Sequence, residues 1–255
     1  MLTYALQWVV GILTLAFAVL AIGMARAKSP GNPSYAFAWR LVGVTFLLHA
    51  ACQMAQYAWG GMALRGGAKS EWMTSYLLWA PAFNHSRTFV LAAMYVALMV
   101  LAIWRVPSGP VFMRAYLGGL VLALGCGILL GTAEGSLVES RHYLRVAGLD
   151  TLELVVALCA LFASLVRDRV DRYLWGALAV KAFTVALSII WFAVLSQINN
   201  PNVWSPAPWQ IAGYRVVLSL VMVALAARCL WRARRGFPAS GLIAGDSRQV
   251  PTFAH

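Results

Sequence analysis

Acidic residues are scarce in this chain of 255 residues. Asp and Glu together number 8, against 20 Lys and Arg, and charged residues make up only 11% of the sequence. Soluble globular proteins carry about 25% charged and about 45–50% apolar residues, whereas 62% of this chain is hydrophobic. The composition therefore excludes a soluble enzyme and a disordered chain, and it indicates a polytopic membrane protein.

Cysteine provides no covalent framework. The four cysteines, Cys52, Cys126, Cys159 and Cys229, lie within or at the ends of apolar stretches and form no CxxC pair. The spacing therefore predicts neither a disulfide scaffold nor a zinc site.

The first 25 residues contain no charged side chain. Because a secretory signal begins with Lys or Arg, we expect this segment to be retained as the first helix.

Seven apolar runs are long enough to cross the hydrocarbon layer, which takes about 20 helical residues. They cover roughly residues 4–23, 41–63, 85–104, 115–134, 146–166, 173–196 and 210–231. No Pro falls inside them and no internal repeat is evident, which argues against a transporter built from two similar halves with broken helices. The sequence predicts an all-α membrane protein. Its seven-helix transmembrane domain covers residues 1–231, and a short basic and then flexible cytoplasmic tail covers 232–255.

The distribution of Lys and Arg predicts the orientation. The first, third and fifth loops and the tail hold thirteen of them, and the other loops hold six. Cytoplasmic loops carry the excess of these residues, so we expect the N-terminus outside and the C-terminus in the cytoplasm. The larger set is Arg26, Lys28, Arg40, Arg105, Arg114, Arg167, Arg169, Arg172, Arg228, Arg232, Arg234, Arg235 and Arg248. The smaller set is Arg65, Lys69, Arg87, Arg141, Arg145 and Arg215.

Two outer connections are expected to do more than join helices. Residues 61–84 form the longest predicted loop, and the apolar patch between Trp72 and Trp79 is too short to span a bilayer. We expect it to lie in the interface or to cap the bundle. Residues 197–209 are rich in Asn, Pro and Trp. Together the two segments predict an aromatic cover, used either for interfacial anchoring or as a lid over an outward-facing pocket.

Polar residues inside the apolar runs form the candidate site, because ionisable groups at membrane depth are costly and usually face the bundle interior. They recur at spacings of three and four residues, which places them on single helix faces. A rise of 1.5 Å per residue places Glu153 about 8 Å above Lys181, close enough to pair. Arg215 is expected to pair with an acidic residue. The predicted site residues are His49, Gln53, Tyr57, Asp150, Glu153, Lys181, Thr184, Ser188 and Arg215.

Two interpretations of this set remain open. The first is a structural network that ties helices together, with hydrogen bonds that average about 0.6 kcal/mol in membranes. The second is a solvated pocket, open to the outside, with Glu153 and Lys181 at its floor. A proton or ion relay is a further alternative. His85, Arg87 and His142 are expected at the outer rim.

Glycine is concentrated in the run at 115–134. Gly127 and Gly131 form a GxxxG pattern, and small residues of this kind let helix backbones approach closely. The pattern favours tight packing within the bundle, and dimerisation is the alternative.

No cofactor or metal is predicted. A haem held by two histidines needs both at similar depth on facing helices, and only His49 lies deep. A haem or chromophore held by His49 alone is disfavoured but stays open. A retinal-type Schiff base is expected on the last helix, where this chain has no Lys. The acidic and His residues near the outer face show no HExxH or comparable metal-binding spacing.

The remaining functions are non-enzymatic. The first is a sensor or binding module whose small amphipathic or lipid-like ligand enters from the outer side, and which signals to a separate membrane or cytoplasmic partner. The second is an accessory or scaffold subunit of a membrane complex, and a transporter using Glu153 and Lys181 is a weaker third. Nucleic acid is excluded as a partner because no basic stretch carries interleaved aromatics. The prevalence of Arg over Lys suggests a bacterial inner membrane.

The helix count, orientation and loop sizes resemble those of the seven-helix sensor modules that precede bacterial histidine kinases. That resemblance implies a sensory role for the bundle. It rests on topology, because no motif of the family is present and no kinase follows, and we do not assign the chain to the family.

Overall fold

The structure is a computed structural model that describes residues 2–28, 32–67, 69–103, 109–135, 142–168, 170–196 and 208–235. These residues form seven helices: α1 (Leu2–Lys28), α2 (Pro33–Gly66), α3 (Glu71–Ile103), α4 (Pro110–Gly135), α5 (His142–Arg167), α6 (Arg172–Ser196) and α7 (Pro208–Arg234). Each contains a segment long and apolar enough to cross a membrane. Over the described residues, the prediction of an all-α fold with seven such helices is therefore confirmed. Residues 197–207 and 236–255, which include most of the predicted sixth loop and tail, lie outside the described residues.

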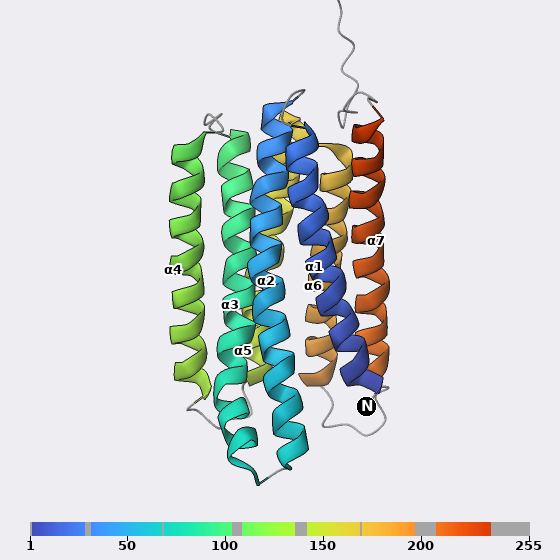
Figure 1. Cartoon of the computed structure of the whole chain (residues 1–255). Helices are drawn as coiled ribbons and strands as arrows, with labels where there is room; N and C mark the ends of the chain where they lie inside the picture. Colours follow the sequence, from blue (N-terminus) through green and yellow to red (C-terminus); the bar gives the residue numbers. More distant parts are fainter. Residues whose placement is uncertain are drawn as a thin grey trace, which may run out of the picture.

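Six of the helices form a closed ring. α1 packs against α2 and α7, α2 against α3, α3 against α5, α5 against α6, and α6 against α7. α4 lies outside this ring and packs mainly on α3 (Figure 1). A ring of six helices has an interior, and the residues that the six helices direct inward therefore decide what the bundle can hold.

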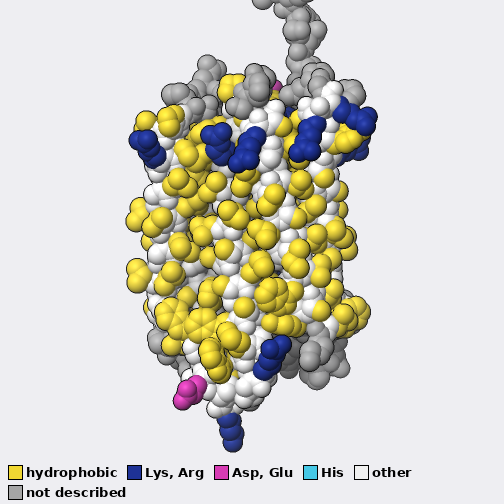
Figure 2. All heavy atoms as spheres, viewed as in Figure 1, with side chains coloured by type: hydrophobic (Ala, Val, Ile, Leu, Met, Phe, Trp, Pro, Cys, Tyr) yellow, Lys and Arg dark blue, Asp and Glu magenta, His cyan; other side chains and the backbone are white. Residues whose placement is uncertain are grey.

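The surface of the bundle is apolar around its middle and basic at one end. Large outward-facing side chains such as Val111, Leu122, Leu129 and Phe162 are more than two-thirds exposed. Hydrophobic side chains cover the central zone in Figure 2, and Lys and Arg gather at the end where α1 finishes and α2 begins. Exposed apolar surface on this scale is what a lipid environment requires, so the chain has the architecture of a multi-pass membrane protein.

The connection predicted at 61–84 is corrected by the structure. α2 continues to Gly66 and α3 begins at Glu71, so that most of this stretch is helical and forms a hairpin projecting beyond the other helices (Figure 1). A search for apolar runs finds only the part of a helix that crosses the hydrocarbon layer. At 1.5 Å per residue, α2 with its 34 residues is about 50 Å long, well beyond the roughly 30 Å of hydrocarbon.

Contacts between the two helices stabilise the hairpin. The rings of Trp59 and Trp79 stack with centroids 6.5 Å apart, and the ring of Phe83 meets that of Trp59 edge-on at 6.0 Å. Gly67, at φ +83°, makes the tight turn, and Ser70 Oγ accepts the backbone N–H of Met73 at the start of α3.

The expectation that the helix interiors lack Pro is wrong for one described helix. Pro81 lies inside α3, because that helix begins fourteen positions earlier than the apolar run at 85–104. Proline removes one backbone hydrogen bond, but α3 continues through it without interruption.

The glycines of α4 fall into two groups. A Cβ added at Gly127 would clash with the Cα atom of Ser86, and one at Gly131 would clash with the Cα atom of Ala82. Both glycines therefore allow α4 to pack directly on the α3 backbone. Gly118, Gly119 and Gly125 have open space around the corresponding position, so they are not needed for this contact.

We expect Gly131→Ala to destabilise the protein by about 1–3 kcal/mol, the cost of overpacking a close contact, because the opposing atoms are backbone that cannot rotate away. Gly125→Ala is the matched control, and its effect should be neutral or stabilising by up to about 1 kcal/mol, since Ala favours the helix. Denaturant unfolding in detergent micelles measures both. Equal stabilities of the two variants would contradict the α3–α4 packing.

Candidate functional site

A cavity of about 100 Å³ lies inside the helix ring. All six ring helices contribute to its lining, and α4 contributes no described residue. Its lining is amphipathic. α1 and α2 supply an apolar wall that includes Val10, Leu13, Phe17 and Phe46, whereas α3, α5, α6 and α7 supply most of the charged groups.

Eight of the nine predicted site residues line this cavity. They come from four helices and comprise His49, Gln53, Asp150, Glu153, Lys181, Thr184, Ser188 and Arg215. Tyr57 is the exception. Its hydroxyl accepts a hydrogen bond from Gln53 Nε2 at 2.8 Å, and its carbonyl accepts one from the hydroxyl of Tyr4 at 2.8 Å. Tyr57 therefore holds the lining residue Gln53 in place from one helical turn further along α2.

Several lining residues escaped the sequence analysis. Thr14, Thr88 and Ser219 are neutral and short, and nothing in the pattern separates them from other hydroxyl residues in the helices. Arg87 was placed at the outer rim because the apolar run begins at residue 85. Since α3 begins at Glu71, Arg87 lies about 24 Å along the helix, at the level of the cavity.

The predicted direct ion pairs are corrected by the structure. Within the described residues, no carboxylate lies within 4.0 Å of Lys181 or Arg215, and the one such ion pair joins Lys28 to Asp171. Arg215 Nη2 instead donates to Ser188 Oγ at 3.0 Å, and Arg87 Nη1 donates to Gln56 Oε1 at 2.8 Å. The charged groups of the cavity are therefore separated by a space. Two of the cations, Arg215 and Arg87, are hydrogen-bonded to neutral partners instead of carboxylates.

Among the described residues, four side chains that line the cavity each have one buried polar atom without a hydrogen-bond partner: His49 at Nδ1, Gln53 at Oε1, Glu153 at Oε1 and Arg87 at Nε. The first three residues are each at most 5% exposed. An unsatisfied buried polar atom costs about 1–3 kcal/mol, and more when it is charged. A group inside the cavity that bonds to these atoms would remove that cost.

The hydroxyl groups of the cavity wall are oriented by their own helices. Thr14 Oγ1 donates to the carbonyl of Val10 at 2.7 Å, Thr184 Oγ1 to that of Val180 at 2.9 Å, and Ser188 Oγ to that of Thr184 at 3.0 Å. Because the proton of each hydroxyl is used in this way, the oxygen lone pairs stay available as acceptors. Ser188 Oγ uses one of them for Arg215.

A hydrophobic layer closes the ring on the basic side of the cavity. Phe17, Trp39, Leu41, Phe46 and Leu178 are each at most 2% exposed there. The rings of Phe17 and Phe46 meet edge-on, with centroids 4.8 Å apart. The cavity residues lie in the middle and in the opposite half of their helices, so access to it is shortest from the end that holds the start of α1 and of α7.

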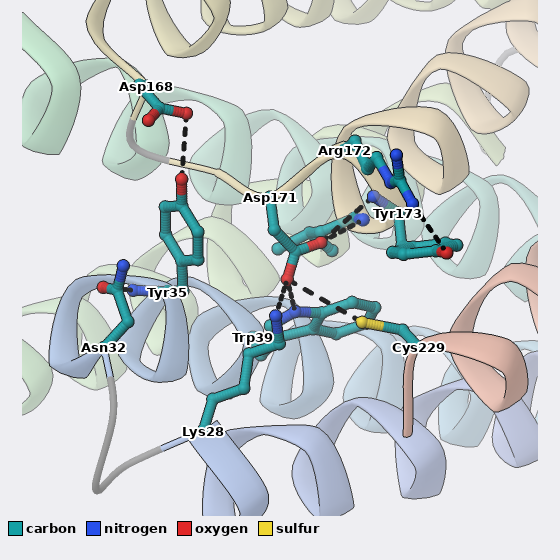
Figure 3. Close-up of polar contacts among 10 residues, drawn as sticks. Lys28, Asn32, Tyr35, Trp39, Asp168, Asp171, Arg172, Tyr173 and Cys229 are labelled. Carbon is teal, nitrogen blue, oxygen red and sulfur yellow. Dashed lines mark hydrogen bonds and ion pairs between the residues drawn. The ribbon is translucent and has the colours of Figure 1, made fainter. Parts of the chain in front are cut away.

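A second polar cluster lies beyond this layer, at the basic end (Figure 3). The carboxylate of Asp171 is 1% exposed, and its Oδ2 atom receives Lys28 Nζ at 2.9 Å and Trp39 Nε1 at 2.7 Å. Its Oδ1 atom accepts the backbone N–H groups of Tyr173 and Leu174, at 3.1 and 2.9 Å, and so caps α6. We call Lys28, Trp39, Asp171 and Cys229 the Asp171 cluster.

The Asp171 cluster joins four helices at one carboxylate. Lys28 comes from α1, Trp39 from α2, Cys229 from α7, where its Sγ atom is 3.9 Å from Oδ2, and Asp171 itself precedes α6. Nearby, the hydroxyl of Tyr35 donates to Asp168 at 2.9 Å and adds a second link from α2 to the α5–α6 turn. The sequence analysis missed the cluster because its carboxylate, that of Asp171, lies between predicted helices, where acidic residues are ordinary.

Comparison with known proteins adds no relative. The chain matches no protein-family model, and a search of curated proteins gives no match.

Proposed function

We propose that this chain is a binding or sensing module of a bacterial inner membrane, whose cavity takes a small amphipathic ligand from the outer side. The observation that carries the proposal is that the cavity-lining residues His49, Gln53 and Glu153 each have a buried polar atom without a partner among the described residues. A purely structural network would give each of these atoms a partner within the protein. The amphipathic lining further suits a molecule with a polar and an apolar part.

The distribution of Lys and Arg supports the proposed orientation of the protein in the membrane. The described Lys and Arg residues outside the cavity lie mostly at the end that carries the Asp171 cluster, and this end is basic in Figure 2. Cytoplasmic ends carry such an excess. We therefore propose that the start of α1 and the α2–α3 hairpin face outside, and that the ligand reaches the cavity from there.

Signal output from such a module requires a mechanical link to the cytoplasmic end. α1, α2, α6 and α7 line the cavity, and the same four helices meet at the Asp171 cluster. A shift of these helices around a ligand would therefore reach the cytoplasmic surface, where a separate partner protein would respond.

The second candidate function is an accessory subunit of a membrane complex. It is favoured by α4, whose glycines at 118, 119 and 125 face open space and whose exposed apolar residues include Val121 and Leu122. A neighbouring transmembrane helix could approach α4 closely there.

Native mass spectrometry of the protein, extracted from native membranes in mild detergent, tests the two functions. A single protomer that carries a reproducible small-molecule mass supports the binding module. A stoichiometric assembly with other polypeptides and an empty cavity would overturn it in favour of the accessory subunit.

A further inference from the structure

We infer that the ligand presents to the cavity one singly charged oxyanion, a carboxylate or a phosphate diester, with a hydroxyl group beside it. This inference rests on the proposed function and specifies the chemistry of its ligand. Three observations lead to it: the balance of charges in the cavity, the kinds of polar atom that lack partners, and the cavity volume.

The formal charges of the cavity sum to one positive charge. Arg87, Lys181 and Arg215 line it together with the carboxyl groups of Asp150 and Glu153. The neutral imidazole of His49 adds no formal charge. An uncompensated charge at membrane depth is costly. A single negative charge on the ligand would balance the five groups.

The cations are placed to receive such an anion. Among the described residues Lys181 makes no hydrogen bond and no ion pair within 4.0 Å, although Glu153 and Asp150 lie within its electrostatic range. Arg87 Nε is buried without a partner, and the other described bonds of Arg87 and Arg215 go to neutral acceptors. An oxyanion bound to these donors would form charge-assisted hydrogen bonds, which are the stronger kind.

The unpartnered acceptors require a donor on the same ligand. Oε1 of Glu153 and Oε1 of Gln53 are both buried acceptors without a hydrogen bond. An anion alone would leave them unsatisfied and would be repelled by Glu153. A hydroxyl group next to the anion donates its one proton to either of these acceptors without adding a positive charge, and therefore fits better than an ammonium group, which would restore the imbalance.

The volume limits how much of the ligand lies inside. An engineered cavity of about 150 Å³ holds benzene, and this one measures about 100 Å³. The part that binds therefore has about six non-hydrogen atoms or fewer, the size of a small hydroxycarboxylate or of part of a lipid head group. The shared chemistry is an oxyanion beside a hydroxyl, and the source is either a free metabolite or a lipid.

Thermal unfolding of the purified full-length protein separates these sources. In nanodiscs of phosphatidylcholine, D-lactate is the soluble probe, and glycerol and D-alanine are the neutral and zwitterionic controls of the same size. In the second arm, phosphatidylglycerol replaces phosphatidylcholine. A ligand that binds only the folded state raises the unfolding temperature with its concentration.

Lys181→Met should weaken the binding of the anion about tenfold or more, because the loss of one hydrogen bond to a charged group lowers the affinity by at least about this factor. Lys181→Arg, which keeps the charge, should restore most of the binding and guards against a fold defect. Arg65→Gln is the matched control, because Arg65 is exposed on the outer hairpin and away from the cavity; it should leave the binding unchanged.

Stabilisation by D-lactate that Lys181→Met abolishes supports the inference with a free ligand. Stabilisation by phosphatidylglycerol alone, with the same loss, supports it with a lipid head group. Equal responses to glycerol, D-alanine and D-lactate in phosphatidylcholine, together with no Lys181-dependent gain in phosphatidylglycerol, would overturn it. A bound molecule that native mass spectrometry identifies as neutral or cationic would also overturn it, while the proposed binding function would stand.

Discussion

Asp171→Ala is expected to lower the free energy of unfolding by about 3–5 kcal/mol, the loss found when one partner of a buried ion pair is removed. The substitution leaves the ammonium group of Lys28 only 9% exposed and without its carboxylate. It also removes the acceptor of Trp39 Nε1 and the cap of α6. Urea or SDS unfolding of the protein in detergent micelles measures the change.

Asp168→Ala is the matched control for that experiment. Asp168 has the same side chain three positions earlier, but it is exposed and accepts a hydrogen bond from the hydroxyl of Tyr35. Exposed polar contacts of this kind contribute about 0–1 kcal/mol. Similar losses for the two variants would mean that the Asp171 cluster is not the link between α1, α2, α6 and α7 that we describe.

Ser219→Phe is expected to abolish ligand binding, because a phenyl ring would occupy most of a cavity of about 100 Å³ that Ser219 lines. The bound mass seen by native mass spectrometry should disappear, and no ligand should raise the unfolding temperature of the variant.

Val217→Phe provides the control on the same helix. Val217 is 59% exposed on the outside of the bundle, so a ring at that position would face lipid and leave the cavity open. Persistence of the bound mass in Ser219→Phe, or its loss in both variants, would place the ligand outside the cavity.

Hydropathy and periodicity predicted the helices and most of the polar lining of the cavity, because a bilayer imposes both. A buried ionisable residue such as Glu153 must face the interior, and spacings of three and four then identify its neighbours on the same helix face. The hydrophobic runs could not show the full length of α2 and α3, since the hairpin that extends them depends on contacts such as Trp59–Trp79. The error in the start of α3 displaced Arg87 from the cavity to the rim.

Pairing between helices was beyond the reach of the sequence. Depth alone made Glu153 and Lys181 a plausible ion pair, whereas the ring holds their charges apart around a cavity. Depth also could not reveal that Asp171, in a short turn, would meet Lys28 and Trp39 from helices more than 130 positions away. Such contacts follow from the order of helices around the ring, which no local pattern encodes.

Thiol accessibility of the cavity tests the central claim most directly. In a background without the four native cysteines, Ser219→Cys would be exposed to a membrane-impermeant thiol reagent in right-side-out vesicles, with Val217→Cys as the lipid-facing control. We predict that the reagent modifies the cysteine at 219 from the outside and leaves that at 217 unmodified. Modification at 219 only in inverted vesicles, or equal labelling at both positions, would contradict an outward-open cavity inside the helix ring.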